Sequence, residues 1–219
     1  MANTLAPKFS ASLSWWPTIR LSFLAWLALV LLVLGLIYML PFWPGLVRSL
    51  TRKSSLMTGL VLGAAGFCLV WRYWLSRWAW WRALDTLEHE LVHMLAAWSV
   101  GGRLVSLQVQ ASGCGSVRWD GARGQWWVAL APYWLPTPLI LGYLFLGKPV
   151  LAHGLAWSWA GCLQAVAWGA LLTWHAISTW RETSAQQPDL QQVGLAYATI
   201  FLVGAHTLIL TSTVRYLVS

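Results

Sequence analysis

The chain has 219 residues, of which 58% are hydrophobic and 9% are charged, and its mean hydropathy is +0.61. A soluble domain typically carries about 25% charged residues, so this composition excludes an ordinary water-exposed surface, and it also excludes disordered chains and coiled coils. The net charge of +8 is scattered without a basic run, which argues against nucleic acid as a partner. The 19 Trp residues suit the membrane–water interface. We therefore expect one membrane-embedded domain over residues 1–219.

The first hundred residues predict three helices. Residues 21–40 carry no charge and are long enough to cross the hydrocarbon of a bilayer. The Pro-Phe-Trp-Pro sequence at 41–44 favours an interfacial helix end, since a cleaved signal peptide would have an apolar core of about 7–15 residues followed by small residues. A second span is expected over 56–71, and a third over 79–100, ending at two consecutive glycines.

Residues 103–119 show the two-residue alternation of a β-strand and predict a small hairpin. One face of its first strand carries Val105, Leu107 and Val109, and the other face carries Ser106, Gln108 and Gln110. Gly113-Cys114-Gly115 supplies the turn to the second strand.

Three further spans are expected over 126–146, 154–174 and 192–213, with a polar loop over 175–192. The prolines near the start of the first of these, Pro132, Pro136 and Pro138, predict a break or kink. Cys68, Cys114 and Cys162 lie in separate segments and are expected to be unpaired thiols. The predicted fold class is an all-α polytopic membrane protein with about six transmembrane helices and one small β-hairpin.

The most informative sequence is Glu88-His89-Glu90-Leu91-Val92-His93, inside the expected third helix. A spacing of four residues places His89 and His93 on one helix face, where both imidazoles can reach one zinc ion at about 2.0–2.1 Å. Glu90 lies beside the first histidine, where it can take a proton from a zinc-activated water. The sequence thus predicts a Zn²⁺ site with Glu90 as the catalytic base.

Another interpretation of the same residues is structural. Two histidines on a helix can be buried hydrogen-bonding partners, with Glu90 paired to an arginine. Ionisable groups inside a membrane span are costly, which favours the functional interpretation. Nearby, Asp85 and Glu88 are expected to support the ligands or to pair with Arg82, without binding the metal themselves.

A catalytic zinc site needs a third protein ligand. Metzincin enzymes have a Gly and then a third His after the second histidine, but this chain has Ala96 and Ser99 at those positions. The remaining candidates are Asp120, His153, His175, Glu182, Asp189 and His206.

The order of the helices narrows these candidates. The second histidine is expected roughly 10–15 Å below the hairpin, given 1.5 Å per helical residue. The fifth span ends on the same side, so the loop after it can fold back to the metal. We favour Asp189 in that loop as the third ligand, with His175 as the alternative. Of the others, His153 lies on the opposite side, Asp120 in a solvated turn, and His206 mid-span, where it hydrogen-bonds between helices.

A zinc-binding string, a hairpin and a proline-led span follow one another in this chain. The string His89-Glu90-Leu91-Val92-His93 is followed by Gly101-Gly102-Arg103, by the hairpin with its Gly turn, and by Ala131-Pro132. This order resembles the site-2 protease family of intramembrane zinc metallopeptidases, especially its compact bacterial members. The resemblance covers about residues 84–195.

The resemblance implies that His89 and His93 are zinc ligands, that Glu90 is the catalytic base, and that an Asp on a later helix is the third ligand. The family's usual third-ligand motif has Asn and Pro before an Asp-Gly pair, whereas this chain has Gln187-Pro188-Asp189-Leu190. The third ligand is therefore the point at which this chain departs from the family pattern.

The resemblance also implies that an unwound substrate adds as a strand to the edge of the hairpin. Gln108 and Gln110 are then candidate substrate-lining residues, although an amphipathic hairpin resting on the bilayer explains them equally well.

We therefore expect a membrane-embedded zinc metalloendopeptidase that hydrolyses peptide bonds of membrane-associated protein substrates. The resemblance to bacterial members implies the inner cell membrane as its location. Two alternatives stay open, namely a non-proteolytic zinc-binding membrane protein and a small transporter that uses its His and Asp residues as a proton or cation relay.

Overall fold

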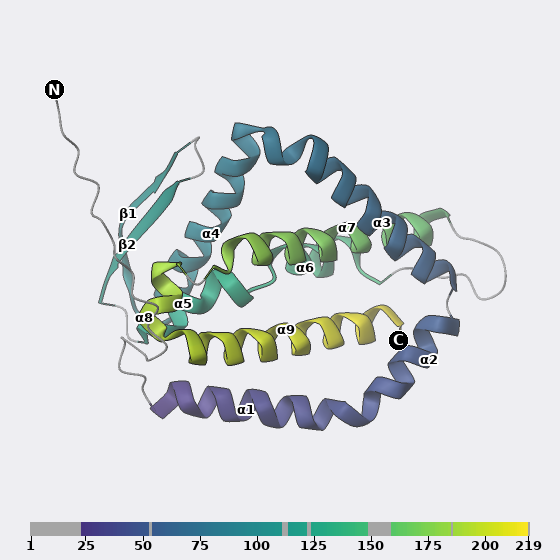
Figure 1. The fold of residues 1–219 in the computed structure, drawn as a ribbon, viewed down its shortest axis with the longest axis horizontal. Helices are drawn as coiled ribbons and strands as arrows, with labels where there is room; N and C mark the ends of the chain where they lie inside the picture. The colour runs from purple at the N-terminus through teal and green to yellow at the C-terminus, as the bar shows by residue number, and fades with distance from the viewer. Residues whose placement is uncertain are drawn as a thin grey trace.

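A computed structural model describes residues 23–52, 54–110, 114–121, 124–148, 159–184 and 186–218 (Figure 1). The α-helices are α1 (Phe23–Met39), α2 (Trp43–Arg52), α3 (Ser54–Tyr73), α4 (Ala79–Ser99), α5 (Gln125–Trp134), α6 (Thr137–Leu141), α7 (Trp159–Glu182), α8 (Pro188–Val193) and α9 (Leu195–Val218). The antiparallel strands β1 (Arg103–Val109) and β2 (Gly115–Asp120) form one hairpin. The fold is therefore mostly helical with a single small hairpin among the described residues.

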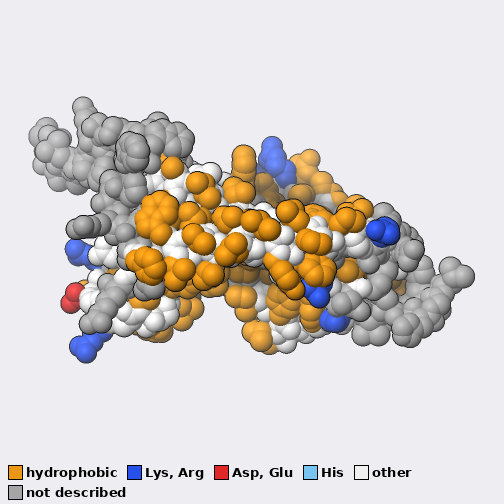
Figure 2. Space-filling view, turned by 90° about the horizontal axis from the view of Figure 1, so that it is seen from below, with side chains coloured by type: hydrophobic (Ala, Val, Ile, Leu, Met, Phe, Trp, Pro, Cys, Tyr) orange, Lys and Arg blue, Asp and Glu red, His pale blue; other side chains and the backbone are white. Residues whose placement is uncertain are grey.

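Four helices are long and apolar enough to cross a membrane, and a bent pair makes a fifth candidate span. The four are Ala25–Gly45, Ser55–Arg77, Trp159–Glu182 and Leu195–Val218, and the bent pair joins Gln125–Trp134 to Thr137–Leu146. Seen from below, the described surface is dominated by hydrophobic side chains, with few charged ones (Figure 2). On α1, Leu31, Leu34 and Ile37 are exposed. An apolar surface of this extent fits contact with lipid, as expected for an integral membrane protein.

The difference from the six expected spans lies in α4. Its helix covers Ala79–Ser99, as predicted, but it is not among the candidate spans. It contains Arg82, Asp85, Glu88 and Glu90, which is more charge than an ordinary lipid-facing span accepts. In Figure 1, α4 runs beside the hairpin, and it contacts both strands and α5, so its polar residues have protein neighbours.

The predicted break in the fourth span is confirmed. The α5 helix ends at Trp134, α6 starts at Thr137, and the two axes differ by 67°. Pro136 separates them, and Pro132 and Pro138 flank the bend. Proline lacks the backbone donor that a continuous helix needs, which explains why the span bends here.

The predicted loop over 175–192 is wrong in its first half. The α7 helix continues to Glu182, α8 covers Pro188–Val193, and the last span starts at Leu195. Polar side chains can extend an apolar helix where another element supplies partners for them, and the end of α7 packs beside polar residues of α4. The start expected for the fifth span, at residue 154, lies outside the described residues.

The hairpin of 103–119 is confirmed, with one irregularity that sequence alternation did not predict. The pairing runs Leu104↔Trp119, Leu107↔Val117 and Val109↔Gly115, with a register shift between Leu104 and Ser106. The extra residue is Val105, which is exposed, whereas Leu107 and Val109 are half-buried. The extra residue of a bulge interrupts the alternation of side chains between the two faces of a strand. Val105 therefore does not share a face with Leu107 and Val109.

A hydrophobic core joins α5, α8 and α9. Its buried members include Leu130, Tyr133, Leu190, Val193 and Phe201. Because α8 has only six residues, its place depends on Leu190 and Val193, which are buried in this core. The core therefore determines where the polar residues at the start of α8 lie.

The crossing of α3 and α7 depends on small residues. Gly59 and Gly63 lie four residues apart on α3, where Gly59 faces Ala165 of α7 and Gly63 faces the backbone of Val166 and Ala170. On α7, Gly169 lies against the backbone of Leu60. A Cβ added at Gly63 would overlap the carbonyl oxygen of Val166. Such small residues at this spacing let two membrane helices approach closely.

We predict that Gly63→Ala lowers the free energy of unfolding of the full chain in detergent by about 1–3 kcal/mol, because the added methyl group forces α3 and α7 apart. The matched control is Gly66→Ala on the same helix, where nothing lies within 4 Å of an added Cβ. The control should be neutral or stabilising by about 0.5–1 kcal/mol, since Ala is the better helix former. Equal unfolding midpoints for the two variants would contradict the close crossing.

Candidate metal centre

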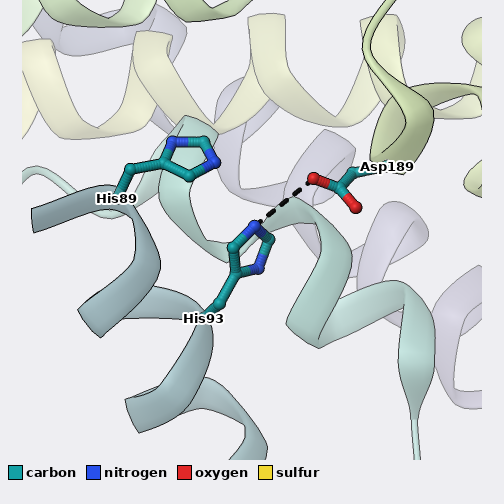
Figure 3. A group of neighbouring side chains, drawn as sticks. All are labelled: His89, His93 and Asp189. Carbon is teal, nitrogen blue, oxygen red and sulfur yellow. Dashed lines mark ion pairs between the residues drawn. The ribbon is translucent and has the colours of Figure 1, made fainter. Parts of the chain in front are cut away.

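His89 and His93 lie one turn apart on the face of α4 that contacts α5. Their ring centroids are 4.9 Å apart and the ring planes are 79° from each other. The His93 side chain is 4% exposed and that of His89 is 15% exposed. Figure 3 shows that one nitrogen of each ring is directed toward Asp189. The helical spacing therefore brings the two imidazoles to one point, as the sequence predicts.

Asp189 reaches this point from the first turn of α8. Its Oδ2 atom is 3.3 Å from Nε2 of His93 (Figure 3). One donor atom from each of His89, His93 and Asp189 lies within 4.8 Å of the other two. Two ligand atoms of a tetrahedral zinc with bonds of about 2.0–2.1 Å are about 3.3 Å apart, so the pair of His93 and Asp189 has the separation of two ligands of one ion.

The outer nitrogen of His93 is held by backbone. Its Nδ1 is 2.8 Å from the carbonyl oxygen of Val128 on α5. A carbonyl oxygen can only accept, so Nδ1 carries a proton, and when the ring is neutral its Nε2 presents a lone pair. That lone pair faces a carboxylate oxygen of Asp189. Two acceptors at 3.3 Å repel unless a cation or a proton lies between them, so this donor set suits a metal ion.

The Val128 carbonyl is free to accept because of the sequence of α5. In a regular helix it would bond the amide of the residue four positions later, which here is Pro132. Proline has no amide hydrogen. Val128 is fully buried, so its carbonyl needs another donor, and the His93 ring supplies one.

The outer nitrogen of His89 is held by a carboxylate. Nδ1 of His89 is 3.0 Å from Oε2 of Glu182, the last residue of α7. The hydroxyl of Ser178, one turn earlier on α7, lies 3.3 Å from Oε1 of Glu182 and 3.2 Å from Oδ1 of Asp85 on α4. Asp85 also pairs with Arg181 at 2.7 Å, so its partner is Arg181 and not the expected Arg82.

Two aromatic side chains enclose the centre. Tyr133 is fully buried, packs edge-on against His89 with centroids 5.3 Å apart, and donates its hydroxyl to Oδ2 of Asp189 at 3.3 Å. Trp119 of β2 stacks on the His93 ring with centroids 5.8 Å apart. These rings limit the access of water to the donor atoms and hold them in place.

Glu90 lies between α4 and the hairpin. Its side chain is 8% exposed, and its carboxyl group is hydrogen-bonded by the backbone of Val117 on β2. A Cβ at Gly115 would come within 2.8 Å of the Glu90 Oε1 atom and 2.5 Å of a methyl group of Thr86. Gly115 is therefore the residue that lets β2 lie against Glu90.

His175, the alternative third ligand, is not part of this donor group. It lies inside α7 and stacks on His206 of α9 with centroids 5.2 Å apart. His206 in turn bonds the Leu202 carbonyl and lies 3.4 Å from the Thr179 hydroxyl. His206 thus contacts a neighbouring helix, as expected from its mid-span position.

The other candidates are also accounted for. Asp120 accepts the amide of Gly121 at the end of the hairpin, away from the donor group. Gln108 and Gln110 are exposed on the hairpin. The three cysteines are free thiols. His153 lies outside the described residues.

Three groups that contact the centre were not predicted from the sequence in that role. Glu182 was considered as a ligand but not as a partner of His89, and neither Tyr133 nor the Val128 carbonyl was predicted. Pro132 could have indicated the role of the Val128 carbonyl, since a proline inside a helix leaves the carbonyl four residues earlier without its usual donor. Nothing in the sequence indicated Glu182 or Tyr133, because both reach the centre through the packing of separate helices.

Comparison with known proteins gives one match. The sequence profile of the Peptidase M50B-like family matches residues 60–180, which contain α4, the hairpin, α5 and most of α7. No curated protein and no solved structure matches the chain. The matched segment ends before Glu182 and Asp189. Because it covers more than half of the 219 residues, the chain belongs to the Peptidase M50B-like family.

Proposed function

We propose that this membrane protein is a zinc-dependent endopeptidase that hydrolyses peptide bonds of membrane-associated proteins. The observation that carries the proposal is the convergence of His89, His93 and Asp189 beside the buried Glu90. Membership in a peptidase family supports the reaction class. The resemblance to compact bacterial members supports the bacterial inner membrane as the location.

Zinc fits these residues better than a hard cation does. The donor group consists of two imidazole nitrogens and one carboxylate oxygen, the ligand types of catalytic zinc sites, which leave a fourth position open. Calcium and magnesium prefer oxygen ligands. When bound, zinc would polarise the scissile carbonyl and acidify water.

Glu90 would act as the general base and then as the general acid. Its carboxylate would take a proton from the attacking water and return that proton to the leaving amine nitrogen. The Val117 backbone and Gly115 restrict the Glu90 side chain, so its carboxylate is held on the hairpin side of α4. Tyr133 would keep Asp189 oriented, and the rings of Tyr133 and Trp119 would exclude bulk water.

The substrate would approach along the hairpin. A peptide bond in a helix is shielded, so the substrate must be extended before hydrolysis, and an extended segment can add to a strand edge. The contact between β2 and Glu90 would bring such a segment next to the base. Gln108 and Gln110, exposed on the same hairpin, are the proposed lining residues.

The first test is Glu90→Gln in the purified full-length chain. We predict at least about a 100-fold loss of hydrolysis, because general acid–base catalysis contributes this much or more, with zinc content unchanged. Hydrolysis would be followed by mass spectrometry of a mixed library of detergent-solubilised transmembrane peptides. The matched control is Asp120→Asn, a carboxylate-to-amide change at an exposed position of the hairpin, which should keep wild-type hydrolysis.

Three outcomes would count against parts of this proposal. Equal cleavage by wild type and Glu90→Gln would remove Glu90 as the base. Tight zinc without cleavage of any library peptide by the wild type would favour a non-proteolytic zinc-binding protein. Failure of the wild type to bind zinc would favour the transporter or relay alternative.

The second test separates the two candidate third ligands. We predict about one zinc per chain in the wild type after dialysis, and loss of that zinc in Asp189→Ala. His175→Ala should keep it, because His175 lies against His206 and not beside the other donors. Zinc would be measured by inductively coupled plasma mass spectrometry. Zinc lost from His175→Ala but retained by Asp189→Ala would reverse the assignment.

A further inference from the structure

An imidazole that binds a metal through Nε2 leaves its Nδ1 atom on the other side of the ring. In both His89 and His93 this Nδ1 atom has a protein contact. For His89 the contact is a carboxylate from another helix, Oε2 of Glu182 at 3.0 Å from Nδ1. We propose that Glu182 is a positioning residue for zinc, acting through His89. This inference rests on the proposed zinc site.

The position of Glu182 suits it to orient His89, which neither a metal ligand nor a surface acid would do. Its side chain is 16% exposed and that of His89 is 15% exposed, so both partners are largely withdrawn from water. A carboxylate at Nδ1 selects the imidazole tautomer with its proton on that atom, which leaves a lone pair on Nε2. A metal-binding histidine held in this way is also a more basic ligand.

Glu182 is itself held in place. Its Oε2 faces His89, while its Oε1 is 3.3 Å from the Ser178 hydroxyl one turn earlier on α7. Both carboxylate oxygens therefore have a contact, and the carboxylate cannot rotate freely away from the ring. The Arg181–Asp85 ion pair joins the same two helices but does not touch either histidine. The chain thus contains a second link between α4 and α7 that does not pass through His89, and the Ser178 hydroxyl lies near both Asp85 and Glu182.

The test compares Glu182→Ala, Glu182→Gln and Arg181→Gln in the full-length protein in detergent. We predict that Glu182→Ala weakens zinc affinity about 10–100-fold, as measured by competition with a chelating dye. Glu182→Gln should lose less, because the amide oxygen can still accept the Nδ1 proton. Arg181→Gln should bind zinc with the wild-type dissociation constant, since it removes the contacts of Arg181 with Asp85 and the Trp71 ring and leaves the Glu182–His89 contact in place.

Two further readouts separate positioning from folding. The thermal midpoint of the metal-free protein reports the link between α4 and α7, and the visible spectrum of the Co²⁺-substituted protein reports ligand geometry. A changed Co²⁺ spectrum in Glu182→Ala would support the proposal. Wild-type zinc affinity in both Glu182 variants, with only the thermal midpoint lowered, would overturn it. If the wild type itself binds no zinc, the proposed function fails together with this inference.

A second, independent observation concerns His93. Its Nδ1 donates to the Val128 carbonyl at 2.8 Å, and the residue four positions after Val128 is Pro132. We infer that Pro132 is a positioning residue for His93, because its lack of an amide hydrogen reserves the Val128 carbonyl for the imidazole. The proline would then have a role in metal binding besides bending the span.

Pro132→Ala tests this inference, because it gives α5 an amide that competes for the Val128 carbonyl. We predict a weaker zinc affinity, near the lower end of the roughly 10–100-fold range, with no loss of stability in the metal-free protein. Pro138→Ala is the matched control: this proline is also buried, but it lies in the first turn of α6, where its missing amide has no partner in that helix. Equal zinc affinities for Pro132→Ala, Pro138→Ala and wild type would overturn the role of Pro132.

Discussion

The site depends on one constraint, which is that the imidazole and carboxyl groups of α4 need partners inside an otherwise apolar bundle. Moving a polar group from water into such surroundings without a hydrogen-bonding partner costs roughly 2–7 kcal/mol. Three elements supply these partners, since β2 contacts Glu90, α5 contacts His93, and α7 contacts both His89 and Asp85. These contacts hold α4 in place. The interactions that offset the cost of burying its polar groups therefore also orient its two imidazoles.

The two histidines are oriented in chemically different ways. His93 donates to a neutral backbone carbonyl, whereas His89 donates to a carboxylate. The carboxylate would make His89 the more basic of the two proposed ligands, while the carbonyl adds no charge to the most buried part of the centre. Fewer charges then have to be desolvated beside Asp189. A further carboxylate near His93 would have added repulsion with Asp189.

Local chemistry could be predicted from the sequence, and contacts between distant segments could not. The spacing of His89 and His93 determines their common face in any helix, and the prolines after Pro132 determine a break in any helix. By contrast, Glu182 and Val128 lie 93 and 35 residues from the histidines they contact. The polar residues of 175–182 predicted a loop, because their partners on α4 could not be inferred from the sequence. Val105 was misplaced by a bulge, which alternation alone does not reveal.

The third donor is set by hydrophobic packing more than by its own motif. Asp189 lies in the first turn of a six-residue helix that is too short to be stable alone. Leu190 is 3% exposed and Val193 is fully buried, and both pack in the core of α5 and α9. Where the related family has Gly after the Asp, this chain has Leu190, and that leucine anchors α8 in the core. The departure from the usual motif therefore replaces a flexible residue by an apolar contact, which explains how Asp189 can reach the histidines without the family's Asp-Gly pair.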